Sequence, residues 1–169
     1  MANLPYYEQK DIENIQKLRT MLKELPPFCT EYFRGIEPRT STRTRIAYAY
    51  DLSVFFDFLK KENPVFSKMD RMDFRLEHRD QLTVTFLVEY MEYLKYRFNE
   101  NNKEVINKER GIMRKISSLK SFYNYFFRVE KIKTNPAALV RLPKLHDKEI
   151  IRLDIDEVAM LLDEVEQGE

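Results

Sequence analysis

Apolar side chains recur at helical spacing (i, i+3, i+4, i+7) in four stretches of the chain, a pattern typical of amphipathic helices. Proline follows the first two stretches, at Pro26-Pro27 and Asn63-Pro64, where it ends a helix. Hydroxyl side chains at residues 40–42 and at Thr83 are placed to cap the second and third. The pattern predicts helices over residues 12–25, between 42 and 63, over 84–98 and over 110–128.

The rest of the chain carries weaker signals. Residues 28–36 form a short separate segment, and residues 65–82 mix charges with scattered apolar residues, which indicates a loop with about one helical turn. Asn135-Pro136 predicts the start of a short helix, and the acids at 154–157 predict a capped helix over Val158–Val165. Since no useful stretch alternates with the period of a strand, we expect an all-α fold.

The stretch 110–128 divides into two faces when its residues are placed at about 100° per residue. One arc holds Ile112, Ile116, Leu119, Tyr123, Phe126 and Phe127. The opposite arc holds Arg110, Arg114, Ser117, Ser118, Ser121 and Arg128. We therefore expect this helix to bury its apolar face and to expose a cationic face that also bears hydroxyls.

The composition excludes several classes of protein. The 169 residues are 43% hydrophobic and 34% charged, as in a globular domain. No stretch approaches the roughly 20 apolar residues of a membrane span, and the first residues do not resemble a signal peptide, so we expect a cytoplasmic protein. Cys29, His78 and His146 are too few for a zinc site, and no phosphate loop or nucleophile motif is present. We expect no catalytic residue, metal or cofactor here.

The net charge of +1 hides an uneven distribution. Residues 149–169 hold eight acids and one base, a charge of −7, so residues 1–148 carry +8. Within that basic part, the windows 39–50 and 110–129 contain no acid at all. This pattern indicates that residues 1–148 form a basic domain that binds an anionic partner.

Both acid-free windows have the chemistry of nucleic-acid contact. Arginine, lysine and hydroxyl side chains bind phosphate oxygens, and arginine also reads base edges in the major groove. Thr40 to Arg45 crowd the first turn of a predicted helix, where free backbone amides favour phosphate as well. The alternative is an ordinary solvated face, but such a face usually mixes charges of both signs.

The order of motifs along the chain points to a family. The first motif is Ser41-x-x-Thr44-x-x-x-Tyr48-x-x-Asp51-Leu52-x-x-Phe55-x-x-Phe58-Leu59. It is followed by Arg114-x-Ile116-Ser117-Ser118-Leu119-Lys120-Ser121-Phe122-Tyr123, then by Asn135-Pro136-Ala137 and Pro143-Lys144. Over residues 28–145 this ordered set resembles the core-binding domain of the tyrosine recombinases, the phage integrase and Xer-like family.

The resemblance implies a SAM-like helical bundle that forms one half of a C-shaped clamp around duplex DNA. It implies a helical arm at residues 1–27, the core-binding domain at 28–145, and a linker with the truncated start of the catalytic domain at 146–169. The full protein would be a bacterial, phage or mobile-element integrase, in the bacterial cytoplasm and nucleoid-associated when bound, that cuts and rejoins DNA through a phosphotyrosyl intermediate. It would act as a tetramer on paired sites, without a cofactor or small-molecule substrate, whereas this stretch alone would not cleave.

The resemblance also implies contact residues, because two helices of the family's domain enter the major groove. On the first of them it points to Arg43, Thr44 and Ala47, to which the crowded helix start adds Ser41 and Arg45. On the second it points to Arg110, Arg114 and Ser118, with Lys115, Ser121 and Lys144 as further phosphate contacts. The family's packing positions fall on Tyr48, Leu52, Phe55, Leu119 and Tyr123.

Two features depart from the family pattern. The helix at 12–25 precedes the usual start of the domain, and Gly111 lies just inside the fourth helix, which implies a later helix start or a close backbone approach to DNA. Two other functions stay open: a stand-alone helical DNA-binding regulator, and an all-α protein-interaction module whose basic face meets an acidic partner.

Overall fold

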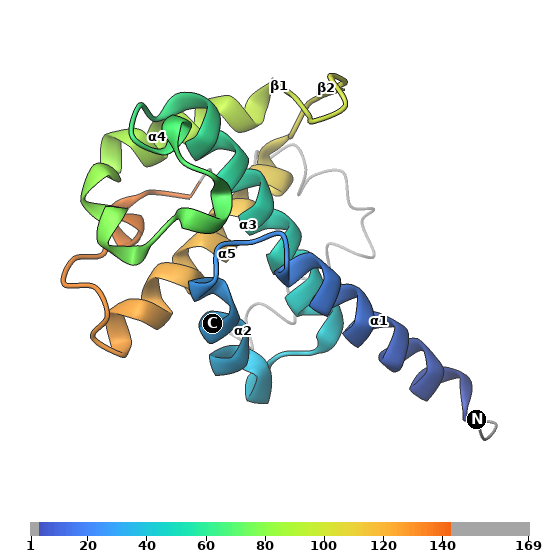
Figure 1. Ribbon diagram of the computed structural model, residues 1–169. Coiled ribbons are helices and arrows are strands. Elements are labelled where there is room, and N and C mark those ends of the chain that lie inside the picture. The colour runs from blue at the N-terminus through green and yellow to red at the C-terminus, as the bar shows by residue number, and fades with distance from the viewer. Residues whose placement is uncertain (1–3, 143–169) are drawn as a thin grey trace, which may run out of the picture.

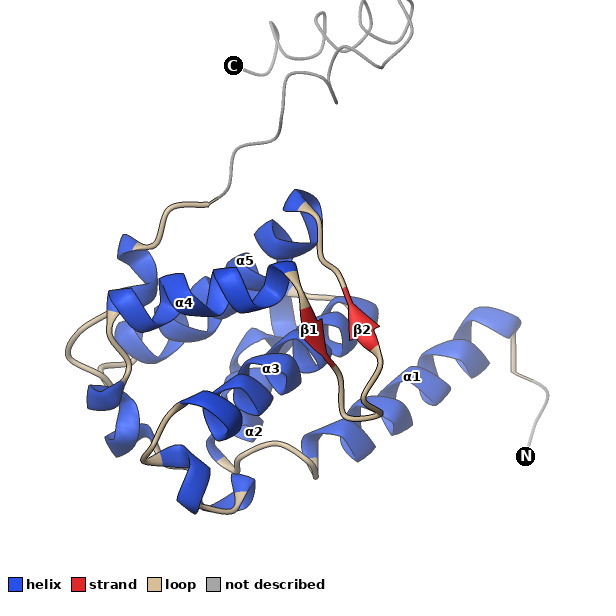
Figure 2. Cartoon of the chain, turned by 90° about the horizontal axis from the view of Figure 1, so that it is seen from above, coloured by secondary structure: helices blue, strands red, loops and turns tan. Residues whose placement is uncertain are grey.

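The computed structural model describes residues 4–142, apart from the side chains of residues 79–81, and it confirms the all-α prediction. The helices are α1 (Tyr6–Leu22), α2 (Phe28–Ile36), α3 (Thr42–Glu62), α4 (Val84–Lys95) and α5 (Glu109–Arg128). Short 3₁₀ helices are η1 (Glu37–Arg39), η2 (Phe66–Lys68), η3 (Arg71–Asp73), η4 (Leu76–Gln81) and η5 (Pro136–Leu139). The two-residue strands β1 (Arg97–Phe98) and β2 (Glu104–Val105) pair antiparallel between α4 and α5 (Figure 2).

Several boundaries differ from the prediction. α1 begins six residues earlier than expected and ends at Leu22, and residues 28–36 form a helix of their own. The segment 65–82 contains three 3₁₀ helices rather than one turn, and α4 stops at Lys95 because the chain turns there into the hairpin. The predicted helix at 158–165 and the segment 146–169 lie outside the described residues, and the proposed domain boundaries stay predictions.

The predicted caps are present. The Ser41 hydroxyl oxygen accepts a hydrogen bond from the Thr44 amide at 3.1 Å, and the Thr83 hydroxyl oxygen accepts one from the Phe86 amide at 3.1 Å. The Asn135 side-chain oxygen likewise accepts the Ala138 amide at 3.2 Å. Each cap satisfies an amide that has no partner within its own helix, which explains where these helices start.

α3 lies at the centre of the bundle and contacts α1, α4 and α5 (Figure 1). Both views show α1 reaching out to one side of the bundle, with the N-terminus at its far end (Figures 1 and 2). The buried Thr42 hydroxyl at the start of α3 donates to the Asp11 carboxylate of α1 at 3.1 Å. α1 is thus attached to the bundle at the first turn of α3.

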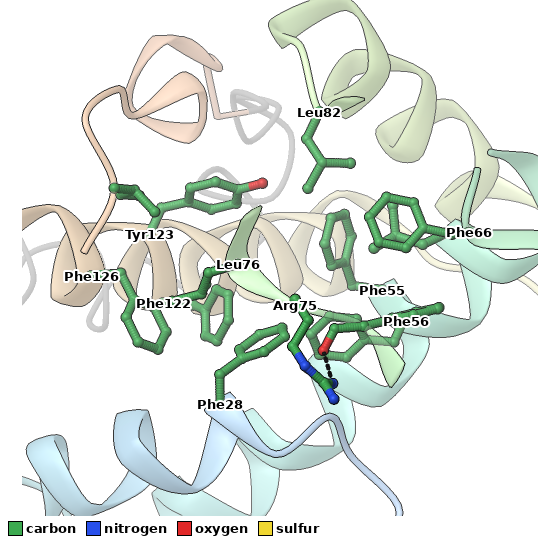
Figure 3. Close-up of a pocket in the computed structure, with 13 residues that line it drawn as sticks. Phe28, Phe55, Phe56, Phe66, Arg75, Leu76, Leu82, Phe122, Tyr123 and Phe126 are labelled. Carbon is green, nitrogen blue, oxygen red and sulfur yellow. Dashed lines mark hydrogen bonds between the residues drawn. The ribbon is translucent and has the colours of Figure 1, made fainter. Parts of the chain in front are cut away.

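Aromatic rings from α2, α3 and α5 fill the centre of the core (Figure 3). The Phe28 ring lies 5.9 Å, centroid to centroid, from both Phe56 and Phe122. The rings enclose a cavity of about 30 Å³, with Arg75 at its edge, which is the space of about one water molecule. Tyr123, whose side chain is buried, also lines it. The cavity is therefore part of the core and too small for a drug-sized ligand.

At Gly35, α2 packs tightly against Tyr125 of α5. A Cβ at this position would overlap the ring of Tyr125, which itself packs against Tyr32 and Phe126. We expect Gly35→Ala to lower the free energy of unfolding by about 1–3 kcal/mol, the usual cost of overpacking, as measured by urea denaturation.

Gly111→Ala is the matched control. The helix begins at Glu109, so the later start considered for Gly111 is wrong. An added Cβ would lie 3.0 Å from the side-chain nitrogen of Asn107, a close contact with the end of a side chain that can shift by a few tenths of an ångström, whereas the Cβ at Gly35 would overlap a packed ring. Alanine at this site should be neutral or stabilising, because it is the better helix former. Equal destabilisation by the two substitutions would contradict the close approach at Gly35.

Candidate nucleic-acid interface

One side of α5 carries a continuous row of cationic and polar side chains. Its members recur at intervals of three and four residues, and all are exposed or half-buried: Arg110, Arg114, Ser117, Ser121, Asn124 and Arg128. We call this row the basic stripe. At 1.5 Å per residue it is about 27 Å long. No acid interrupts it, because residues 110–129 contain none.

A buried carboxylate lies beneath the first half of the basic stripe. Asp51 of α3 has no exposed side-chain surface and accepts hydrogen bonds from Arg114 at 2.8 Å, Lys115 at 3.1 Å and the Ser118 hydroxyl at 2.7 Å. We call these four residues the Asp51 cluster. It joins α3 to α5 through two cations and one anion, so one positive charge is left over. Arg114, whose side chain is 54% exposed, carries that charge to the surface.

The cluster corrects two of the predicted surface contacts. Lys115 is 4% exposed, with its ammonium on Asp51 and 4.9 Å from the centre of the Tyr50 ring, and Ser118 is fully buried. Both lie on the edge of the arc that α3 covers, so their polar groups contact protein rather than solvent. The predicted exposure of Ser118 on the cationic face is therefore wrong, and Lys115, predicted as a phosphate contact, is buried.

Arg45 is a third correction. Its side chain is only 8% exposed, and its guanidinium donates to the carbonyls of Glu37 and Thr40 and to the hydroxyls of Thr40 and Thr42. A buried guanidinium needs such acceptors. Arg45 therefore fastens η1 to the first turn of α3 and is not a surface residue.

The other predicted residues at the start of α3 lie at or near the surface. Ser41 and Arg43 are exposed, and Thr44 and Ala47 are half-buried. Ser41 caps the helix and donates to the Thr44 hydroxyl oxygen at 3.0 Å. Because Asp51 of α3 binds to α5, this helix start and the basic stripe belong to one rigid pair of helices. Lys144 lies outside the described residues.

Three further residues differ from the expectation. Phe127, predicted for the core, is 47% exposed, since it lies at the edge of the apolar arc. Tyr48, matched to a packing position, is only half-buried and borders a surface hollow. Asn124 belongs to the basic stripe, although it is not among the predicted contact residues. Its spacing of three from Ser121 and four from Arg128 could have placed it on the same face of α5. Leu52, Phe55, Leu119 and Tyr123 are buried as predicted.

The described residues give little evidence for a metal site, a reactive cysteine or a membrane-spanning helix. No three His, Cys, Asp or Glu side chains among those that the structure describes gather as a metal site would require. Cys29 is fully buried, and burial raises the pKa of its thiol, so the reactive thiolate is disfavoured. None of the described helices is both long and apolar enough to cross a membrane.

The comparisons with known proteins agree with the motif order. The chain is 35% identical over 148 residues to the tyrosine recombinase XerC of Caldanaerobacter subterraneus subsp. tengcongensis, a match that covers 83% of this chain and 40% of that protein. It is 39% identical over 112 residues to XerC of Lacticaseibacillus casei, covering 66% of this chain and 31% of that protein. The chain is a homologue of the XerC tyrosine recombinases.

XerC of Chlorobaculum tepidum is 29% identical over 160 residues, which is 94% of this chain and 40% of that protein. The chain thus spans less than half the length of these XerC relatives. No family model and no solved structure matches it. The similarity to XerC confirms the resemblance found in the motifs.

Proposed function

We propose that the described helices bind duplex DNA as the core-binding half of a tyrosine recombinase clamp. The observation that carries the proposal is the basic stripe: three of its six side chains are Arg, two are Ser and one is Asn, and no acid lies among them. These side chains bind phosphate oxygens and base edges. The XerC relatives, which are named recombinases, support the same function.

The dimensions of the stripe fit a helix that crosses the major groove. Its length of about 27 Å exceeds the groove width of about 12 Å, so its ends meet the phosphate backbones when its middle faces the bases. Arg114 then faces base edges, and Arg110 and Arg128 face phosphates. Arg43, exposed at the start of α3, adds a phosphate contact beside the stripe.

In a protein of the relatives' length, this domain would hold DNA while the remainder breaks and rejoins strands. Such a protein would work in the bacterial cytoplasm as a tetramer on paired sites. The domain contributes DNA affinity and part of the sequence specificity, and sequence-dependent DNA deformability contributes another part of that specificity.

Salt-dependent binding tests the proposal. The 169-residue chain should bind a fluorescein-labelled duplex in anisotropy titrations at low salt, with log K falling linearly against log salt concentration. Three phosphate contacts from Arg43, Arg110 and Arg128 would give a slope of about −2.7, and fewer contacts a proportionally smaller one.

An acidic polypeptide is the control for the protein-interaction alternative. Duplex DNA should displace poly-glutamate of equal total charge, because hydroxyl, amide and guanidinium donors fit a groove and not a flexible carboxylate chain. Equal affinity for the two polyanions, or a DNA affinity that does not change with salt, would contradict the proposed function.

A further inference from the structure

A polar hollow lies at the C-terminal end of the basic stripe, where α5 passes the junction of η1 and α3. Its volume is about 280 Å³. The lining side chains come from four elements and the turn between two of them: Ile36, Arg39, Thr40, Tyr48, Ser121, Asn124 and Arg128. No acid lines it, although 28 of the 169 residues are Asp or Glu.

The acceptor groups in the hollow are already engaged. The Thr40 hydroxyl donates to the Ile36 carbonyl at 2.6 Å and accepts from Arg45, and the Asn124 side-chain oxygen accepts from Asn135 at 2.7 Å. The Asn124 amide nitrogen, which can only donate, is the part of that side chain left over. The hollow therefore presents few acceptors to a ligand.

The donors in the hollow, in contrast, are available. Arg39 and Arg128 are exposed and have no hydrogen bond or ion pair with any residue that the structure describes, and the same holds for the Tyr48 hydroxyl. The Ser121 hydroxyl lies 2.8 Å from the Tyr32 hydroxyl, and when Tyr32 donates, Ser121 keeps its own hydrogen for a ligand. Burial raises the pKa of Tyr32, which keeps this phenol protonated and able to donate.

We propose that this hollow binds one backbone phosphate of the DNA, held between Arg39 and Arg128 with Tyr48, Ser121 and Asn124 as donors. Two guanidinium groups around a donor-rich, acid-free hollow match the charge and the oxygens of a phosphate. The position fits too: along α5, Arg128 lies about 21 Å from Arg114, beyond the width of a groove that Arg114 occupies. The inference rests on the proposed function, because the phosphate comes from DNA bound along the stripe.

The double variant Arg39→Ala/Arg128→Ala tests the inference in the 169-residue chain. Both residues are exposed and unpaired, so the variant should melt at the wild-type temperature. We expect its DNA dissociation constant to rise about tenfold at 100 mM salt, the equivalent of one charge-assisted contact. The salt slope should shrink by about 0.9, the value for one phosphate, and both changes should be equal for two duplexes of unrelated sequence, because a phosphate contact carries no sequence information.

Lys68→Ala/Lys133→Ala is the control, since it removes two exposed cations that do not line the hollow. An equal loss of affinity in this control would overturn the inference, because a general charge effect would then suffice. If the wild-type chain binds DNA and the double variant binds it equally well, the inference is overturned and the proposed function is left intact. Absence of wild-type binding would overturn the proposed function itself.

Sodium phosphate distinguishes the two sources of this anion. In an NMR titration against sodium chloride of equal ionic strength, millimolar phosphate should shift the amides of Thr40, Ser121 and Asn124 only weakly, because a single free anion lacks the support of the duplex. Saturation by free phosphate below 1 mM, together with unchanged DNA binding by the double variant, would show a site for the free ion and overturn the inference.

Discussion

Asp51→Ala should destabilise the protein by about 3–5 kcal/mol, the usual cost of removing one partner from a buried ion pair. Without the carboxylate, the ammonium of Lys115 stays 3% exposed with only the Tyr50 ring as a partner, and the Ser118 hydroxyl keeps only the Arg114 carbonyl as an acceptor, at 3.1 Å. α3 and α5 then lose the polar contact that joins them. Urea denaturation followed by circular dichroism measures the effect.

A second variant separates ion pairing from packing. Asp51→Ala/Lys115→Met removes both buried charges, and it should recover most of the lost stability, since an apolar pair often replaces a buried ion pair at little cost. Asp57→Ala, on the same helix, is the matched control: this carboxylate is 38% exposed and pairs with Arg71 at 3.4 Å, so its loss should cost less than about 1 kcal/mol. A failure of the Met variant to recover stability would contradict the role of Lys115.

Arg114→Ala should weaken DNA binding by about 1–3 kcal/mol, roughly five- to 150-fold in the dissociation constant, if Arg114 reads a base edge. Asp51 holds one terminal nitrogen of the guanidinium at 2.8 Å, while 54% of the side chain faces solvent. The remaining N–H donors are therefore available to a base, and the anchored side chain loses little entropy on binding. Anisotropy titrations against a set of single-base variants of the duplex measure the effect.

The fold should survive this substitution, because Asp51 keeps Lys115 and Ser118. Arg114→Lys keeps the charge and loses the planar, bidentate donor pair, so it should restore phosphate attraction without restoring discrimination between bases. Lys68→Ala, outside the stripe, should leave affinity unchanged to within about twofold. Loss of affinity that is uniform across all duplexes would show that Arg114 contacts a phosphate instead of a base.

Much of the fold follows from local signals along the chain. The hydroxyls of Ser41 and Thr83 cap helices where the sequence predicts them, and the apolar stripe of α5 is buried except for Phe127. Local signals could not predict whether residues at the edge of a helix face are buried or exposed, because the neighbouring helix determines which edge it covers. The short helix α2 and the 3₁₀ helices at 66–81 were missed for a related reason: tertiary packing, not periodicity, fixes segments of this length.

The sequence predicted which helices carry the candidate site but not which of its side chains are buried. Arg45, Lys115 and Ser118 carry the right chemistry but are buried, since each satisfies a polar partner inside the protein. One signal for this was present: Asp51 lies among apolar residues of α3, and a charge in such surroundings needs a buried partner. The hollow, in contrast, is built from residues 36–48 and 121–128. The spacing of residues within either segment does not predict that the two come together.

The most direct test of the DNA-binding face is to map where a duplex touches the chain. Backbone amide shifts of the isotope-labelled protein should be followed by NMR as a generic duplex is added at low salt and the salt is then raised. We predict that the shifts cluster at residues 40–47 and 110–128 and fade as salt increases, because phosphate contacts release counterions. Shifts that instead gather on α4 and the β1–β2 hairpin, or a folded protein whose α3 start and α5 stay silent, would contradict the assignment of this face to DNA.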